Sequence, residues 1–364
     1  MTVSATTESR HVDLPGRLGD PNRTLAEDRR ADRRMVLALA ALGLDREQPR
    51  PVSALSSRKE LLAFVADAEK GFQAAFGALL STLEPVPGVS HETVTIAGAD
   101  GNQISLYLHR PARSAADGRA FPCVVHFHGG GGVILSATEP CYARWRDELA
   151  AAGTVVVGVE FRNAGGALGN HPYPAGLSDC ASAVRWASSS MRDLGVRNVI
   201  VSGESGGGNL SLAVALKAKR DGWLDELAGV YAMAPQIASP WDKPADLPSQ
   251  SENDGYFISC ELLGVMGAVY DSSGESAQDP LCWPSRASDD DLTGLPPHVI
   301  SVNELDPLRD EGIAYQRRLV QSGVSAVGRT VNGTVHGAEV FLAAALPDVS
   351  AATIRDIHGF AASL

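Results

Sequence analysis

The sequence predicts an α/β protein in which a mostly parallel sheet of eight strands carries helices on both faces. Strand patterns and helix patterns alternate along most of the chain, which is typical of parallel strands joined by crossover helices. A serine flanked by glycines stands between one strand pattern and the next helix pattern, and four consecutive glycines follow another strand pattern. Both features indicate sharp backbone turns at strand ends.

Two helices are expected before this alternation begins. A T-x-x-E motif at residues 24–27 can cap a helix that runs to about residue 44, and an S-x-x-E motif at residues 57–60 can cap another to about residue 83. Residues 1–90 are therefore expected to form an N-terminal cap over the carboxyl edge of the sheet, with the first 20 or so residues disordered. An interaction or dimerisation arm is the alternative.

The remaining residues, 91–364, are expected to form the sheet domain. Strand patterns fall near residues 93–97, 104–109, 122–128, 154–160, 198–203, 228–233, 298–303 and 325–331. Helix patterns fall near residues 139–151, 174–190, 206–220, 310–322 and 350–363. Residues 236–290 break the alternation and carry aromatic residues, which suggests a second cap element. Trp241, Tyr256 and Phe257 are its candidates for a pocket wall.

Ser205 lies in a G-x-S-x-G pentapeptide at residues 203–207, between a β-branched run and an Ala- and Leu-rich run. A serine on such a strand-to-helix turn has a strained backbone, and its hydroxyl is exposed in front of a helix N-terminus. This context predicts a nucleophile. A phosphate-binding loop is the alternative, but the lysine that such a loop requires does not follow in the sequence.

Glycines 129–132 follow the buried strand pattern. Consecutive glycines cost backbone entropy, so they are expected where the main chain must approach another group closely or adopt a positive φ. An oxyanion hole needs both properties, because its donors are main-chain N–H groups. This loop is therefore a candidate oxyanion hole, and a flexible turn is the alternative.

A serine nucleophile also needs an acid and a base, which follow in the order Ser, Asp, His in this arrangement. Asp306 falls on the loop after the strand pattern at residues 298–303, at the sheet edge where the serine turn opens. Glu304 and Asp310 are competing carboxylates. They are more simply interpreted as a strand-end residue and a helix N-terminal residue.

Two histidines, His336 and His358, follow Asp306 in the sequence. His336 lies on the loop after the last strand pattern, at the same edge of the sheet. His358 lies in a C-terminal amphipathic helix and is expected at the surface or an interface. The sequence therefore predicts Ser205, Asp306 and His336 as the catalytic residues.

These motifs together resemble those of the hormone-sensitive-lipase-like esterases, a branch of the α/β-hydrolase fold. The resemblance rests on H-G-G-G at residues 128–131, G-E-S-G-G-G-N at 203–209 and D-P-L-R-D-E at 306–311. It spans roughly residues 100–360. The stretch V-E-F-R-N at residues 159–163, together with the G-E-S-G-G-G-N motif, is most similar to the brefeldin A esterase subgroup.

The resemblance implies that the N–H groups of Gly130, Gly131 and Gly206 bind the oxyanion. The chain departs from the family at Gly132, where many members carry a bulky aromatic residue. A glycine there is expected to widen the substrate pocket for esters of bulky, branched alcohols. The alternative is that an aromatic residue of the cap, such as Tyr256 or Phe257, fills the gap.

Composition restricts the partners and the location of the protein. The net charge of −12 disfavours nucleic acids and anionic membrane surfaces as partners. The five cysteines have neither the spacing of a disulfide framework nor that of a zinc site. The longest apolar run is about half as long as a membrane span requires, and the first residues lack a signal-peptide pattern. A cytoplasmic protein without a membrane span is expected, and a homodimer is left open.

The sequence thus predicts a carboxylic ester hydrolase that acts on a small-molecule ester, of small to medium size or with a bulky alcohol. The expected mechanism uses an acyl-enzyme intermediate and needs neither a metal nor an organic cofactor. An amidase or acyltransferase with the same residues is one alternative, because it would share the acyl-enzyme. A non-catalytic ligand receptor is another, and the presence of all three catalytic residues disfavours it.

Overall fold

The structure is a computed structural model, and the residues it describes are 16–18, 20, 22–46, 52–112, 120–240 and 247–364. Its centre is an eight-stranded sheet with the order β1-β2-β4-β3-β5-β6-β7-β8. The strands are Val89–Ala97 (β1), Gln103–Pro111 (β2), Phe121–Phe127 (β3), Val155–Glu160 (β4), Val196–Glu204 (β5), Gly229–Met233 (β6), His298–Asn303 (β7) and Ala326–Val331 (β8). Strand β2 pairs antiparallel with β1 and β4, and the remaining pairs are parallel. The predicted α/β class and the mostly parallel sheet are confirmed.

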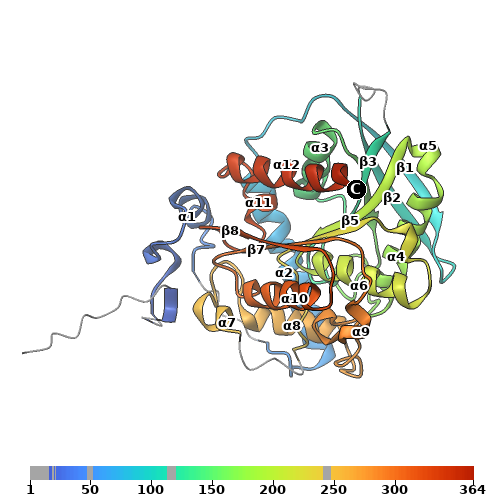
Figure 1. Cartoon of the computed structure of the whole chain (residues 1–364). Helices are drawn as coiled ribbons and strands as arrows, with labels where there is room; N and C mark the ends of the chain where they lie inside the picture. Colours follow the sequence, from blue (N-terminus) through green and yellow to red (C-terminus); the bar gives the residue numbers. More distant parts are fainter. Residues whose placement is uncertain (1–15, 19, 21, 47–51, 113–119, 241–246) are drawn as a thin grey trace, which may run out of the picture.

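Helices cover both faces of this sheet (Figure 1). The long helices of the sheet domain are Pro140–Ala151 (α3), Ala175–Ser189 (α4), Gly206–Arg220 (α6), Arg309–Gln321 (α10) and Pro347–Ser363 (α12). Shorter ones are Met191–Leu194 (α5), Leu224–Glu226 (η3), Pro284–Arg286 (η4), Asp289–Leu292 (α9) and Ala338–Phe341 (α11). Helices α3 and α12 pack on one face, and α4, α6 and α10 pack on the other.

Alternating side chains of the central strands enter two separate apolar cores. In β3, Val125 points into the core under α4 and α6, whereas Val124 points into the core under α3 and α12. Both are fully buried, as expected for a parallel strand that is covered on both faces. The closely packed centre of the sheet therefore supports the loops at its carboxyl edge.

The N-terminal region differs from the predicted pair of long helices. Arg58–Leu80 (α2) begins at the predicted capping box of Ser57, but the predicted helix over residues 24–44 is wrong. Its capping box closes only a three-residue 3-10 turn, Leu25–Glu27 (η2), because the chain continues in an extended conformation at Asp28. A new helix, Arg33–Ala40 (α1), then follows its N-cap residue Asp32, whose side chain accepts a hydrogen bond from the Arg34 N–H.

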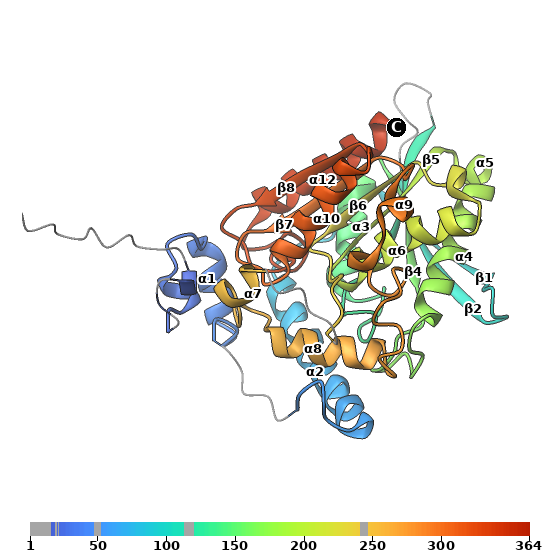
Figure 2. The same ribbon diagram turned by 60° about the horizontal axis from the view of Figure 1, so that its bottom comes forward.

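Most of the predicted disordered segment lies outside the described residues. In the part of this segment that the structure describes, Gly16–Leu18 (η1) form a 3-10 turn, which contacts the short helix Ser249–Glu252 (α7). The insertion that contains α7 also forms Cys260–Tyr270 (α8), which packs against α2. Figure 2 shows α2 and α8 side by side on one side of the sheet domain.

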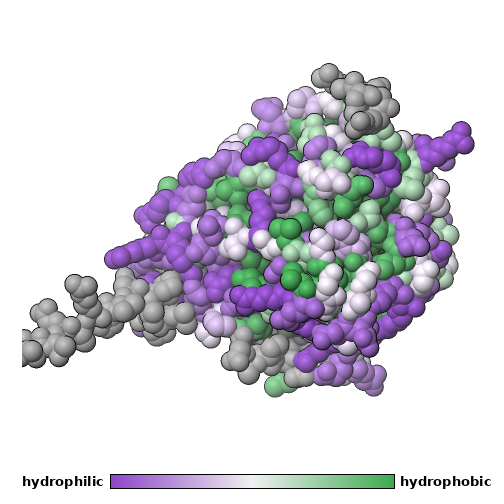
Figure 3. Space-filling view, viewed as in Figure 1, coloured by the Kyte–Doolittle hydropathy of each residue, from purple (hydrophilic) through white to green (hydrophobic). Residues whose placement is uncertain are grey.

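The face of the molecule shown in Figure 3 is covered mainly by hydrophilic residues, with smaller hydrophobic areas between them. Among the described helices, we find none with the length and apolar character needed to cross a membrane.

Candidate active site

The carboxyl ends of four strands bring the predicted catalytic residues to one edge of the sheet. Ser205 directly follows β5, Asp306 lies on the loop after β7, and His336 lies on the loop after β8. The glycine loop at residues 129–132 follows β3, the neighbour of β5. Because these strands are parallel, all four loops open on the same side.

Ser205 has the strained backbone that the sequence pattern predicts. Its φ is 57° and its ψ is −118°, an unusual conformation for a residue with a side chain, and α6 begins at the next residue. The Ser205 N–H donates to the carbonyl oxygen of Met233 at 3.0 Å. A Cβ atom at Gly203 or Gly207 would lie 2.4 or 2.0 Å from the carbonyl oxygen of Phe127. Glycines are therefore required on both sides of the turn for it to pack against the end of β3.

The glycine loop and the start of α6 are in direct backbone contact. Gly130 and Gly131 have φ values of +94° and +68°, which favour glycine. A Cβ atom at Gly206 would lie 2.5 Å from the Cα of Gly131. The main chain after Ser205 and the main chain of the loop thus meet without intervening side chains, as an oxyanion hole requires.

Asp306 and His336 form a buried hydrogen-bonded pair. The distance from Asp306 Oδ2 to His336 Nδ1 is 2.8 Å, and the two residues are 0% and 4% exposed. The second carboxylate oxygen of Asp306 accepts the Leu308 N–H at 2.9 Å. Burial alone would lower the pKa of His336, but the negative charge and hydrogen bond of Asp306, with smaller contributions from Glu339 and Glu204, raise it above its usual value of 6.5.

The competing residues have other contacts. A carboxylate oxygen of Glu304 accepts a hydrogen bond from the Gly333 N–H at 2.8 Å. The carboxylate of Asp310 accepts hydrogen bonds from the Arg309 side chain and from the Ser249 N–H. His358 lies near the amino ends of the strands, opposite to the edge where the candidate catalytic residues meet. Its Nδ1 is 2.9 Å from the hydroxyl of Thr154, the residue before β4 begins.

Ser205 and His336 line one apolar cavity together with Gly130 and Gly131. Its walls come from α2, α8 and the residues around them: Phe72, Phe76, Ile134, Leu135, Tyr142, Gln236, Phe257, Ile258, Leu262, Leu263, Met266 and Phe341. Phe72 and Phe76 on α2 were not among the pocket residues predicted from the sequence. Their i, i+4 spacing, which places them on one helix face, is the signal that was available.

Gly132 and Tyr256 were also predicted to line the pocket, but neither lines the cavity, and Trp241 is outside the described residues. Gly132 is not among the residues that line the cavity, because the ring of Tyr270 occupies the space beside it. Tyr256 is 1% exposed and belongs to a different apolar cluster with α1, where its hydroxyl donates to Asp28. Phe257 does line the cavity.

Replacement of Gly132 is therefore expected to affect stability more than pocket width. A Cβ atom would lie 2.9 Å from the Tyr270 ring, and the φ of Gly132 is +69°. Gly132→Ala should lower the free energy of unfolding by about 1–3 kcal/mol. Gly101→Ala is the matched control, because Gly101 has a φ of +78° and open space around it. Equal losses in urea unfolding of the two variants would contradict a clash with Tyr270.

Glu204 lies behind the glycine loop and was not recognised as a site residue from the sequence. It is fully buried, and its Oε1 accepts the Gly129 N–H at 2.6 Å. Its Oε2 lies 3.2 Å from Nε2 of His126, whose pKa burial holds well below its usual value. Burial raises the pKa of Glu204 to about 8, against the lowering effect of the Gly129 N–H. The side chain links the serine turn to the start of the glycine loop.

This pKa predicts a pH-dependent stability. The unfolded chain releases the proton of Glu204 near its usual pKa of 4.5, whereas the folded protein retains it up to about pH 8. The stability contributed by Glu204 is thus complete below pH 4.5 and is lost as the pH rises through 8. Glu204→Gln keeps an acceptor for the Gly129 N–H but cannot ionise. The free energy of unfolding of the variant relative to that of wild type should rise between pH 4.5 and 8, by at most about 5 kcal/mol. The difference between the two Tm values, measured over this pH range, should rise with it. A pH-independent difference would contradict the raised pKa.

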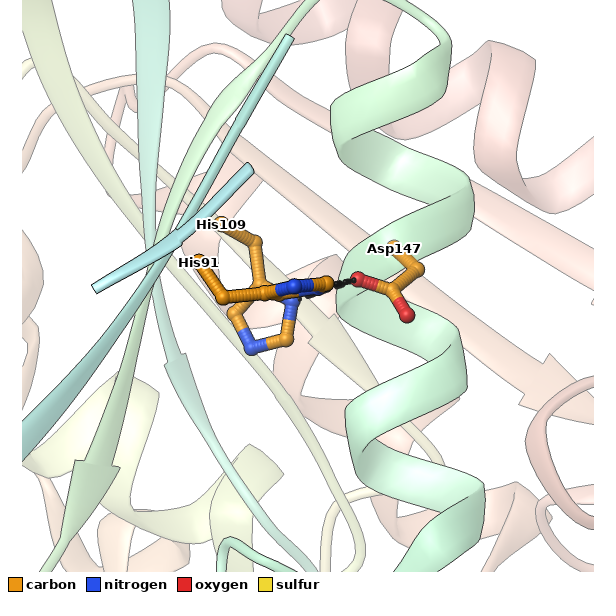
Figure 4. Close-up of side chains that lie close together, drawn as sticks. All are labelled: His91, His109 and Asp147. Atoms are coloured by element: carbon orange, nitrogen blue, oxygen red, sulfur yellow. Dashed lines mark hydrogen bonds and ion pairs between the residues drawn. The ribbon is translucent and has the colours of Figure 1, made fainter. Parts of the chain in front are cut away.

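A second cluster of polar side chains lies away from this site, between two strands and α3 (Figure 4). Asp147 Oδ1 is 2.7 Å from Nε2 of His91 and 2.7 Å from Nδ1 of His109. Nε2 of His109 accepts a hydrogen bond from Nε of Arg146 at 3.0 Å, so the ring proton sits on Nδ1. A metal ion at Nδ1 would require the other tautomer, whose Nε2–H would face the Arg146 N–H. The donor set therefore fits a hydrogen-bonded network better than a metal site.

Comparison with known proteins identifies the fold family of the chain. The model of a family described as alpha/beta hydrolase fold matches residues 124–340. Esterase LipI of Mycobacterium tuberculosis is 30% identical over 243 residues, which cover 65% of this chain and 71% of the relative. Carboxylesterase NlhH of the same organism is 32% identical over 245 residues, with 65% and 72% covered.

Solved structures extend the similarity over nearly the whole chain. Brefeldin A esterase, a bacterial homologue of human hormone-sensitive lipase, has a TM-score of 0.90 and 45% identity, and the match covers 96% of this chain and 98% of that one. Esterase Est22 has a TM-score of 0.79 and 38% identity, with 93% and 99% covered. The resemblance inferred from the motifs is confirmed. The chain belongs to the alpha/beta hydrolase fold family, among the hormone-sensitive-lipase-like esterases.

Proposed function

We propose that the protein is a carboxylesterase in which Ser205, His336 and Asp306 form the catalytic triad. The observation that carries this proposal is the buried Asp306–His336 pair, whose histidine shares one apolar cavity with Ser205. The relatives named above include esterases and a carboxylesterase, which supports ester hydrolysis as the reaction.

The reaction begins when Ser205 Oγ attacks the ester carbonyl carbon and its proton passes to Nε2 of His336. Asp306 holds the proton of His336 on Nδ1 and stabilises the imidazolium that forms. The N–H groups of Gly130, Gly131 and Gly206 donate to the oxyanion of the tetrahedral intermediate. The loss of one such donor typically costs about 10²–10³-fold in rate.

The intermediate collapses when His336 donates its proton to the leaving alcohol oxygen, and an acyl-enzyme remains on Ser205. A water molecule then attacks the acyl carbon while His336 accepts its proton. A second collapse releases the carboxylic acid and restores the serine hydroxyl. Each step moves one proton through Nε2 of His336, which must be neutral at the start.

The cavity supports an ester with small to medium apolar groups as the substrate. Apart from the catalytic groups and Gln236, its walls consist mainly of aromatic and aliphatic side chains. Phe72 and Phe76 on α2 and Met266 on α8 come from the N-terminal region and the insertion. We propose that these two elements, but not α1, form the cap over the site.

Hydrolysis of matched p-nitrophenyl esters and p-nitroanilides with the same acyl group tests this function. An esterase should hydrolyse the esters much faster. Comparable rates on the anilides would identify an amidase, preferential transfer to an added alcohol would identify an acyltransferase, and no turnover of either would favour a receptor.

A further inference from the structure

The helix α1 contacts the loops that carry the acid and the base but does not line the cavity. In both Figure 1 and Figure 2, α1 lies beyond one end of β7 and β8. It packs into an apolar cluster that includes Leu305, the residue before Asp306, and Val335, the residue before His336. Met35 of α1 lies in the same cluster and is fully buried.

Hydrogen bonds join the N-terminal segment to the loop that carries His336. The N–H of Asp32 donates to the carbonyl oxygen of Gly333 at 2.9 Å, and the N–H of Val335 donates to Sδ of Met35 at 3.3 Å. The loop therefore uses its backbone groups on both sides of Thr334 to bind the N-terminal segment.

Ion pairs join the same segment to the loop that carries Asp306. Arg30 binds Glu252 at the end of α7, and Arg309 binds the other oxygen of that carboxylate at 2.9 Å. The neighbouring Asn253 donates to the carbonyl oxygen of Asp306 at 3.1 Å. Glu252 and Asn253 are 4% and 0% exposed, so this connection is shielded from solvent.

The acid and the base thus stand on separate loops, and one segment holds both. We propose that residues 25–40 are a positioning element that fixes the separation of Asp306 and His336. This inference rests on the proposed function of the two residues. A displacement of about 1 Å between reacting groups can cost about 10²-fold in rate, so the contacts of α1 affect catalysis without touching the substrate.

Met35→Ala tests this role in the full-length protein, with Leu194→Ala as the matched control. Leu194 is 4% exposed and lies on α5, in a different apolar cluster, and it does not line the cavity. Both changes remove most of a buried aliphatic side chain. Folded sites are counted from the end-point of labelling by a fluorophosphonate, so that kcat refers to competent protein.

Met35→Ala should lower kcat per titrated site by about 10–100-fold with little change in KM for a p-nitrophenyl ester. Asp306 raises the pKa of His336, so a looser pair should also shift the acid limb of the pH profile of kcat/KM to lower pH. Leu194→Ala should change neither quantity. Met35→Leu should restore most of kcat, because it refills the volume.

Arg30→Gln breaks the connection to Glu252 outside the apolar cluster and provides a second test if Met35→Ala does not fold. It should give a smaller loss of kcat and a shift of the acid limb in the same direction. Wild-type kcat and an unshifted acid limb in Arg30→Gln, or equal losses of kcat in Met35→Ala and Leu194→Ala, would overturn the positioning role. Failure of the wild type to hydrolyse esters or to be labelled would instead overturn the proposed function, and this inference with it.

Discussion

Ser205→Ala is expected to lower kcat for ester hydrolysis by about 10⁶-fold, the largest effect of any single substitution considered for this chain. The variant loses the atom that forms the acyl-enzyme, while the oxyanion donors and the cavity remain. The residual rate should be that of water attack on a bound ester. Initial rates on a p-nitrophenyl ester, with the protein concentration checked by absorbance, measure this loss.

Labelling provides the control for this prediction. A fluorophosphonate should add once to the wild type, on the peptide that contains Ser205, and should not add to Ser205→Ala. The fold should be unaffected, because the Ser205 N–H that holds the turn belongs to the main chain. Labelling that persists in the variant would show that another residue is the nucleophile.

His336→Ala should lower kcat by about 10⁴-fold or more, because the serine proton then has no acceptor. His358→Ala is the matched histidine control and should leave kcat unchanged, since His358 contacts Thr154 at the opposite edge of the sheet. Measurements of kcat and KM for both variants on one ester decide between them. A large loss in His358→Ala with an active His336→Ala would overturn the triad.

The same histidine predicts the pH dependence of the reaction. His336 must be neutral to act as a base, and its pKa is raised above 6.5. The acid limb of kcat/KM in the wild type should therefore lie above pH 6.5, with activity lost as the pH falls through this pKa.

Asp306→Asn should keep the fold but lower kcat steeply, because the amide would hold the imidazole in the wrong tautomer.

The strands and the positions of the candidate catalytic residues were predictable because they depend on local patterns and one topological rule. A buried β-branched run predicts a strand, and parallel strands place their carboxyl ends on one edge. The positions of Ser205, Asp306 and His336 at strand ends follow from these two facts. The order of the residues along the chain then leaves few combinations.

The pocket was less predictable because its shape depends on contacts between distant segments. The space beside Gly132 is filled by Tyr270, which comes from the insertion after β6. Glu204 at the end of β5 accepts a hydrogen bond from the N–H of Gly129, which follows the neighbouring strand β3, and this contact could not be read from the sequence. The start of α1 was also missed, because the capping pattern at Thr24 is genuine but closes only a single turn.

The contact between Gly206 and Gly131 has a consequence for how the specificity of such an enzyme can be altered. Since main chain meets main chain there, a Cβ atom at Gly206 has no space, and the φ of +68° at Gly131 disfavours any residue other than glycine, so both positions tolerate little variation. The α2 and α8 side of the cavity has no such restriction, because Phe72 and Met266 are side chains on separate helices. Laboratory or natural selection can therefore change the range of accepted esters by exchanging residues on those helices, while the reactive end remains a fixed module.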